Sequence, residues 1–433
     1  MLNLIGVIVA FAIVIYLIRR KFNFGLSLIV GSIILGLFSL QEIEFSEIPK
    51  AFIEAIFYHF EDQPLESIIT SFDYQNLFSD TIELALLMTF IFMLAKMMQE
   101  TGAIKKLIDS LRTIFSKGGA LGIVPAIYGL MPVPGGALFS APTIDEEGNK
   151  FNISKVEKNF LNVWFRHIWF AIYPISSAMI LICSATFSNI NIYFLVLINF
   201  PAFFTSIFIG YFYLKKFLRN KSRTDEKIDR DYSGLIYLLP PLLPLLFYWV
   251  LTPFGVTQIQ SFLIGVLFSI LLLFYLVKSN KKEYLQKMKK SLTINLALAI
   301  FGIMIFREMF EVSGASQLIA DIISAFPFPK ILIIIFIPII LGILTGYNLG
   351  AVSLSYPLIS PFFQFTGIQI AGLTSIIFIS SLVGYLISPI HLCNVLSSEY
   401  LKTDTTRMYK MYIPSAIMML IVQSIIVVIF FRI

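Results

Sequence analysis

Long apolar stretches alternate with short polar loops along the whole chain. Ten of these stretches are long and uniform enough to cross a membrane as helices. They lie at residues 2–18, 24–40, 82–99, 160–183, 190–214, 232–251, 258–277, 291–310, 370–398 and 411–431. Two more, at 119–142 and 331–361, are interrupted by Gly and Pro and lack the pattern of simple spans. The pattern predicts an all-α, polytopic membrane protein with about ten transmembrane helices.

The composition agrees with this pattern and indicates no separate soluble domain. Hydrophobic residues make up 58% of the chain and charged residues 13%, with a mean hydropathy of +0.85. Charged residues alone supply about 25% of a typical soluble domain. The N-terminal run "MLNLIGVIVAFAIVIYLIRRKF" differs from a secretory signal, because its basic residues follow the apolar core and it has no A-x-A-like site. We therefore expect a retained first span.

Basic residues are concentrated in six loops, which hold 26 of the 32 Lys and Arg residues. These loops are 19–23, 103–118, 143–159, 215–231, 278–290 and 399–410. Short basic loops face the cytoplasm in multi-pass proteins of the inner (plasma) membrane. All six can do so only if the N-terminus is outside and both interrupted segments return to the side from which they entered. We therefore expect re-entrant hairpins at 119–142 and 331–361 and a cytoplasmic linker at 215–231.

The connector at 41–81 is acidic and contains a single basic residue, so we expect it on the opposite side of the membrane as a solvated segment. His59 within it is interpreted as a surface residue.

The two halves of the chain resemble each other. The stretch "FIFMLAKMMQETGAIKKLI" resembles "IMIFREMFEVSGASQLIADI", and "PAIYGLMPVPGGALFSAP" resembles "PIILGILTGYNLGAVSLSYP". The matches pair Gly102 with Gly314, Pro125 with Pro338, and Gly129 with Gly342. A weaker match places Ser176 opposite Ser397. Matches in one order at a nearly constant offset indicate an internal duplication.

The charge assignment makes the two copies run in opposite directions. Span 82–99 runs from outside to inside, whereas its partner 291–310 runs from inside to outside. We therefore predict two inverted-topology repeats, at 1–214 and 232–433, joined by the linker 215–231. Such repeats are typical of secondary transporters, whose binding sites lie where broken helices of the two halves meet.

The interrupted segments place open backbone where lipid cannot pair with it. An unpaired N–H or C=O there costs several kcal/mol unless protein or a water-filled cavity satisfies it. Helices beginning at such tips present free N–H groups that favour an anion, and nearby hydroxyl and amide groups can bind a carboxylate or sodium. The candidate binding residues are Pro134, Gly135, Gly136 and Ser140 in the first tip, and Gly346, Asn348, Gly350, Ser353 and Ser355 in the second. The alternative is that both segments are kinks stabilised by helix packing.

A polar centre interrupts the span after the second hairpin. In "GYLISPIHLCNVLSSEY", Ser388 and Pro389 break the helix, and His391 and Asn394 follow at one-turn spacing. We add Ser388, His391 and Asn394 to the candidate site. His391 either carries a coupling proton or donates to a carboxylate. A neutral His391 paired with a backbone carbonyl is the alternative.

Four other polar residues in apolar segments are interpreted as interfacial. Arg166 and His167 are expected near the cytoplasmic entry of their span, with their polar groups reaching toward water. Lys96 and Glu308 lie close to span ends and are expected to do the same.

The sequence indicates no cofactor, and sodium at the hairpin tips is the one metal ion considered. Cys183 and Cys393 both lie inside apolar segments. That placement argues against a disulfide framework or a thiolate metal site. We expect both to be packing residues.

The features "PGGALFSAP", "GYNLGAVSLSYP" and "SPIHLCNVLSSEY" resemble an uncharacterised prokaryotic integral membrane family, domain of unknown function 401. That family is similar to the ion transporter superfamily of gluconate, lactate, citrate and dicarboxylate carriers. The resemblance covers nearly the whole chain. It implies a homodimer with a scaffold region and a transport region that moves like an elevator. The Ser-Asn-Thr signature of the sodium-coupled dicarboxylate carriers is absent from both tips.

Together these features predict a secondary transporter of a small organic anion, a carboxylate above all, coupled to protons or sodium. Its partners are the anion, the coupling ion and the lipid bilayer, with no nucleic acid. An ion channel of the same fold is one alternative, and a membrane-embedded enzyme is an alternative of a different class. Enzymatic activity is not expected, because H-E-x-x-H, Walker A and G-x-S-x-G motifs are absent and the chain has only three histidines.

Overall fold

The computed structural model describes residues 2–57, 79–115, 118–130, 135–219, 231–325, 329–362 and 367–432. Throughout these ranges the regular structure is helical, without a β-strand. Eight helical segments among the described residues are long and apolar enough to cross a membrane. The predicted fold class, an all-α integral membrane protein, is therefore confirmed.

The helices of the first half of the chain are α1 Leu2–Arg19, α2 Phe24–Phe38, α3 Glu47–Phe57, α5 Asp80–Glu100, α6 Ala103–Ile114, α7 Ala120–Gly129, α8 Ala137–Asn149, α9 Lys155–His167, η3 Ile168–Ala171, α10 Ser177–Cys183 and α11 Ile192–Leu218. Those of the second half are η4 Ser233–Leu238, α12 Leu239–Leu251, η5 Thr252–Phe254, α13 Gln258–Val277, α14 Lys281–Ser291, α15 Asn295–Val312, α16 Ala315–Ser324, α17 Lys330–Thr345, α18 Asn348–Ile359, η6 Ser360–Phe362, α19 Ile368–Ile387, α20 Leu392–Leu401 and α21 Thr405–Phe431.

Two of the ten predicted spans are divided. The expected break at Ser388 is present, between α19 and α20. The predicted span 160–183 is also broken, because the chain leaves the helix between Ala171 and Ser177, where Pro174 cannot donate a backbone hydrogen bond. A third predicted span, 24–40, forms α2, which has only 15 residues.

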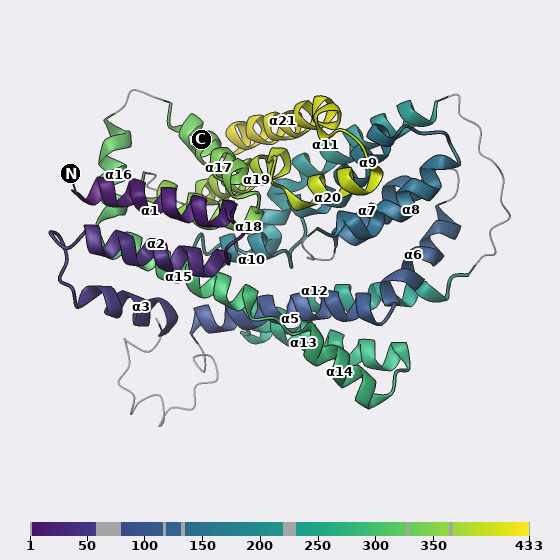
Figure 1. Cartoon of the computed structure of the whole chain (residues 1–433). Coiled ribbons are helices and arrows are strands. Elements are labelled where there is room, and N and C mark those ends of the chain that lie inside the picture. The colour runs from purple at the N-terminus through teal and green to yellow at the C-terminus, as the bar shows by residue number, and fades with distance from the viewer. Residues whose placement is uncertain are drawn as a thin grey trace.

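The helices pack as two groups. In the first helix group, α1, α2, α3, α5 and α12 to α15 contact one another. In the second helix group, α7 to α11 contact α17 to α21. Figure 1 shows α5, α12, α13 and α14 along the lower side of the molecule and α11, α19, α20 and α21 along the upper side. Helices α6 and α16 contact members of both groups.

The same order of elements occurs twice along the chain, and the packing between the copies is reciprocal. Helix α2 packs on α15 as α13 packs on α5, and α20 packs on α8 as α10 packs on α18. Helices α11 and α21, each 27 residues long with one internal proline, pack on each other. This exchange of partners agrees with the predicted repeats, and the internal duplication itself stays a prediction. The opposite membrane orientation of the halves stays a prediction.

Residues that the sequence pairs between the halves have equivalent positions. Gly102 and Gly314 both have positive φ, at 76° and 70°, in the turns before α6 and α16. Gly129 of α7 lies against the backbone of Arg166 in α9, and Gly342 of α17 lies against Tyr385 in α19. Both glycines therefore allow a hairpin helix to touch the following helix without an intervening side chain.

The weaker pairing of Ser176 with Ser397 is wrong in register. Ser176 is the N-cap of α10, whereas Ser397 lies inside α20. The N-cap of α20 is His391, which is the residue equivalent to Ser176.

Both interrupted segments form two helices that pack on each other, α7 with α8 and α17 with α18. The second helix of the first pair begins at Ala137. In the second pair Gly346, at a φ of 61°, ends α17 in the left-handed conformation that glycine adopts without strain. Residues 131–134, at the first tip, lie outside the described residues. Entry and return on one side of a membrane stays a prediction.

Candidate functional site

A cavity of about 330 Å³ lies between the two helix groups. This volume is within the range of small-molecule sites, roughly 300–1,000 Å³. One side of the cavity is formed by the first helix group, together with the residue before α2 and the loop before α15. Its lining residues are Asn23, Phe24, Met88, Ile91, Phe92, Thr293, Asn295, Leu296 and Ala299. The second helix group and its loops supply Gly129, Gly135, Arg166, Phe170, Tyr173, Ser176, Ser177, Ala178, Gly346, Tyr347, Asn348, Leu349, Tyr385, His391, Leu392 and Cys393.

Three helices begin at the wall of this cavity. Gly135 precedes the start of α8, Asn348 is the first residue of α18, and His391 is the N-cap of α20. The first N–H groups of a helix have no partner within it and carry a partial positive charge. The breaks in the two halves of the chain therefore point helix N-termini toward one cavity.

Arg166 adds a full positive charge to this wall. It lies in the last turn of α9, is 2% exposed, and donates from Nη1 to the carbonyl oxygen of Tyr128 at 2.6 Å. Its guanidinium also lies against Gly136, where a Cβ atom would come within 1.9 Å of Nη2. Among the described residues that line the cavity, Arg166 is the only Arg, Lys, Asp or Glu.

The expected interfacial position of Arg166 and His167 is wrong. Every residue from Lys158 to His167 is buried within the protein. The reason is the unpredicted break after α9, which ends this helix inside the molecule rather than continuing it to residue 183. Lys96 differs: it is partly exposed and donates from Nζ to the carbonyl oxygen of Lys290 at 3.0 Å.

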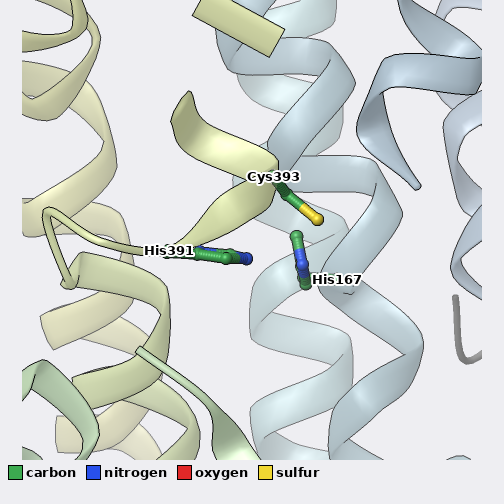
Figure 2. A group of neighbouring side chains, drawn as sticks. All are labelled: His167, His391 and Cys393. Carbon is green, nitrogen blue, oxygen red and sulfur yellow. The ribbon is translucent and has the colours of Figure 1, made fainter. Parts of the chain in front are cut away.

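His167, His391 and Cys393 form a cluster beside Arg166. Their ligand-capable nitrogen and sulfur atoms all lie within 4.8 Å of one another. Figure 2 shows the three side chains pointing toward a common space. All three are buried, with exposures of 3%, 1% and 4%. Cys393 is therefore more than the packing residue that its sequence position predicts, whereas Cys183 is buried in the apolar core.

Hydrogen bonds fix one of these imidazoles. Nδ1 of His167 lies 2.6 Å from the carbonyl oxygen of Val163, and Nε2 lies 3.4 Å from the hydroxyl of Tyr385. Neither ring nitrogen of His391 has a hydrogen-bond partner among the described residues. The alternative, in which the His391 imidazole is paired with a backbone carbonyl, is therefore not found among the described residues.

The predicted site residues divide into two sets. Gly135, Gly346, Asn348 and His391 line the cavity. The Oδ1 atom of Asn348 is buried without a hydrogen-bond partner among the described residues. Pro134 lies outside the described residues.

The other predicted residues stand behind the cavity wall. Ser140 donates to Oδ1 of Asn162, which binds the start of α8 to α9. The remaining polar candidates each donate a side-chain hydrogen bond to a main-chain carbonyl oxygen. They are Ser353, Ser355, Ser388 and Asn394. Gly350 packs against the ring of Phe24, and Gly136 packs against Arg166. These residues shape the wall, and any direct contact with a ligand stays a prediction.

Sequence reasoning missed several polar residues of the cavity. Asn23 and Asn295 meet from the two halves of the chain, with Nδ2 of Asn23 donating to Oδ1 of Asn295 at 3.2 Å. Each precedes or begins a predicted apolar span, where a polar residue is ordinarily interpreted as an interfacial cap. Tyr347 and Tyr385 also line the cavity. Their closeness in sequence to the predicted site residues Gly346 and Ser388 was the signal that could have identified them.

Comparison with known proteins identifies a family. No curated protein matches the chain. Among solved structures, the YdaH transporter of Alcanivorax borkumensis is similar, with 13% sequence identity, coverage of 85% of this chain and 89% of that chain, and a TM-score of 0.48. The family model described as "Protein of unknown function (DUF401)" matches residues 62–430. The chain therefore belongs to the DUF401 family of proteins of unknown function.

Proposed function

We propose that this protein is a secondary transporter of a small organic anion, with Arg166 binding a carboxylate group of the substrate. The observation that carries the proposal is a buried guanidinium in a cavity that has no Asp or Glu among its described lining residues. The guanidinium places a full positive charge at the cavity wall, and its planar arrangement of N–H donors matches the two oxygens of a carboxylate.

The helix N-termini add to this preference. Backbone N–H groups at the starts of α8 and α18 lie on the same wall as Arg166, and they favour an anion for the same electrostatic reason. A hydrogen bond to a charged group contributes about 1.5–3 kcal/mol, and arginine can form two parallel bonds with one carboxylate. The apolar residues opposite, among them Phe24, Met88 and Ile91, suit a short hydrocarbon body.

The division of the cavity wall supports an elevator mechanism. Arg166, Asn348, His391 and the helix N-termini all belong to the second helix group, whereas the first group supplies mainly apolar residues. Movement of the second group past the first would carry an intact anion site across the membrane. We also propose that the two halves are inverted repeats, as in other secondary transporters. The protein would be a dimer in the inner membrane, with its central loop in the cytoplasm.

Coupling to protons or to sodium belongs to the same proposal. His391 is the candidate proton carrier, because an imidazole changes charge near physiological pH. The hydroxyl and amide oxygens at the hairpin tips are the candidate ligands for sodium.

Uptake into proteoliposomes tests the proposal. Radiolabelled mono- and dicarboxylates are offered under an imposed proton gradient and, separately, a sodium gradient. We expect accumulation of at least one carboxylate, with a loss of at least tenfold in Arg166→Gln and a smaller loss in Arg166→Lys. Arg307→Gln is the matched control, since Arg307 pairs with Glu311 at 3.0 Å on α15 and does not line the cavity. Uptake by Arg166→Gln at the wild-type rate would contradict the proposal that Arg166 binds the anion.

A further inference from the structure

We infer that His167, His391 and Cys393 form a binding site for a thiophilic metal ion, Zn²⁺ or Cu⁺. Two imidazoles and one thiolate are ligands that both ions accept. The three residues come from the last position of α9 and from the N-cap and first turn of α20. Their ligand atoms lie within 4.8 Å of one another, and their side chains converge (Figure 2).

The hydrogen bond of His167 prepares it as a ligand. The carbonyl oxygen of Val163 can only accept a proton, so the contact of 2.6 Å places the imidazole hydrogen on Nδ1. Nε2 then keeps its lone pair, and it is the nitrogen nearer Tyr385 in the cavity wall. Metal-binding histidines are ordinarily fixed in this way by a hydrogen bond from the other ring nitrogen.

His391 provides the second, independent observation. It is 1% exposed, and both ring nitrogens lack a hydrogen-bond partner among the described residues. Buried polar atoms are rarely left without partners, because their loss of hydration costs free energy. A bond from one ring nitrogen to a metal ion would satisfy an imidazole whose nitrogens have no hydrogen-bond partner among the described residues.

The spacing of the ligands needs a small adjustment. Metal–ligand bonds of about 2.0–2.3 Å in a tetrahedral arrangement place ligand atoms roughly 3.3–3.8 Å apart. The widest separation of 4.8 Å must therefore shrink by about 1 Å, which side-chain rotation supplies. Binding forms one metal–sulfur bond and two metal–nitrogen bonds, and the proton of the Cys393 thiol is released to solvent.

Three protein ligands leave a fourth coordination position, which faces the cavity because His391 and Cys393 both line it. With the thiolate, bound Cu⁺ forms a neutral complex and bound Zn²⁺ a complex of charge +1. The neutral complex adds no repulsion to Arg166, whereas the zinc complex increases the demand for an anion in the cavity. This inference does not depend on transport, since a chain that moved no carboxylate could still bind the ion.

Spectroscopic titration tests the site on the full-length, tag-free protein in detergent. Co²⁺ replaces Zn²⁺ as the coloured probe, and Cu⁺ is offered from a chromophoric copper chelator. We expect one ion per chain, with a thiolate-to-cobalt charge-transfer band for Co²⁺ or withdrawal of copper from the chelator, and binding at least tenfold weaker in Cys393→Ser. Cys183→Ser, at the other buried cysteine, should bind as the wild type does. Absence of stoichiometric binding of either ion, or equal losses in the two serine variants, overturns the inference.

Alkylation of the wild-type chain provides a measurement that does not depend on how the variants fold. A small maleimide is added with and without Zn²⁺ or Cu⁺, and mass spectrometry follows each cysteine. The metal should slow modification of Cys393 at least tenfold and leave the rate at Cys183 unchanged. A Cys393 rate unaffected by both ions contradicts the site.

Discussion

Replacing Gly136 by alanine should displace Arg166 without unfolding the protein. The added Cβ atom would lie 1.9 Å from Nη2, 2.4 Å from Cζ and 2.7 Å from Nη1 of Arg166. The guanidinium must therefore retreat by about 1.5 Å to restore a normal contact of roughly 3.5 Å. Its bond from Nη1 to Tyr128, 2.6 Å long, lengthens or breaks with this movement.

The magnitude follows from the bond that the substrate would lose. One hydrogen bond to a charged group is worth about 1.5–3 kcal/mol, which corresponds to a roughly 10- to 150-fold rise in the Kd for a carboxylate. The free energy of unfolding should fall by no more than about 1.5–3 kcal/mol, the cost of losing the bond to Tyr128, because the atoms in the way are the far end of a flexible side chain. Gly136 also has an ordinary right-handed conformation, with φ at −59° and ψ at −14°, that alanine adopts readily.

The assay uses the carboxylate that best stabilises the wild-type protein in a thermal-shift panel. Its Kd is measured by calorimetry, and the unfolding temperature is measured without ligand. Gly122→Ala is the control, because its Cβ would meet only the ring of Phe165, at 3.3 Å and beyond. Wild-type affinity in Gly136→Ala, with the control also unchanged, would refute the role of the Arg166 position. A large loss of stability without ligand would refute the argument that the side chain yields easily.

Two further substitutions test hydrogen bonds that hold the second helix group together. Gln423 of α21 accepts from the backbone N–H of Ala202 at 3.0 Å and donates to the carbonyl of Ile198 at 2.8 Å, completing α11 beside its proline. Gln423→Leu leaves both buried groups unpaired and should lower the free energy of unfolding by about 2–4 kcal/mol, seen as a lower unfolding temperature; an unchanged temperature contradicts this. Asn162 donates to the carbonyl of Ala137 at 2.9 Å, so Asn162→Ala should speed hydrogen exchange in the first turn of α8 relative to α18, and equal rates would show that the bond does not hold α8.

The fold was predictable where local pattern determines structure. Span length, the Gly and Pro interruptions and the pairing of Gly102 with Gly314 all depend on sequence within one helix or turn, so they are visible without tertiary information. The break after α9 was missed because Pro174 lies in a run otherwise apolar enough to cross a membrane. Its counterpart at Ser388 was recognised, and comparison of the halves at an offset of 215 residues, which pairs Pro174 with Pro389, would have exposed both.

The chemistry of the cavity was less predictable, because it depends on residues distant in sequence. Arg166 was expected to reach toward water on the assumption of one continuous span, whereas its side chain is buried in the protein at the cavity wall. Cys393 meets His167 from the other half of the chain, and no local spacing rule describes such a cluster. Only the packing of α9 against α20 brings them together.

The contact at Gly129 and Gly342 has a consequence for gating. Each hairpin touches its neighbouring helix main chain to main chain, at Arg166 in one half and Tyr385 in the other. If one tip moved alone, its main-chain contact with the neighbouring helix would have to break. In the first half, Arg166 lies at that contact and would be displaced with the tip. We therefore do not expect the two helix pairs to act as gates that open independently. In the proposed transport cycle, access to the cavity would instead alternate through displacement of the whole second helix group, to which both helix pairs are joined.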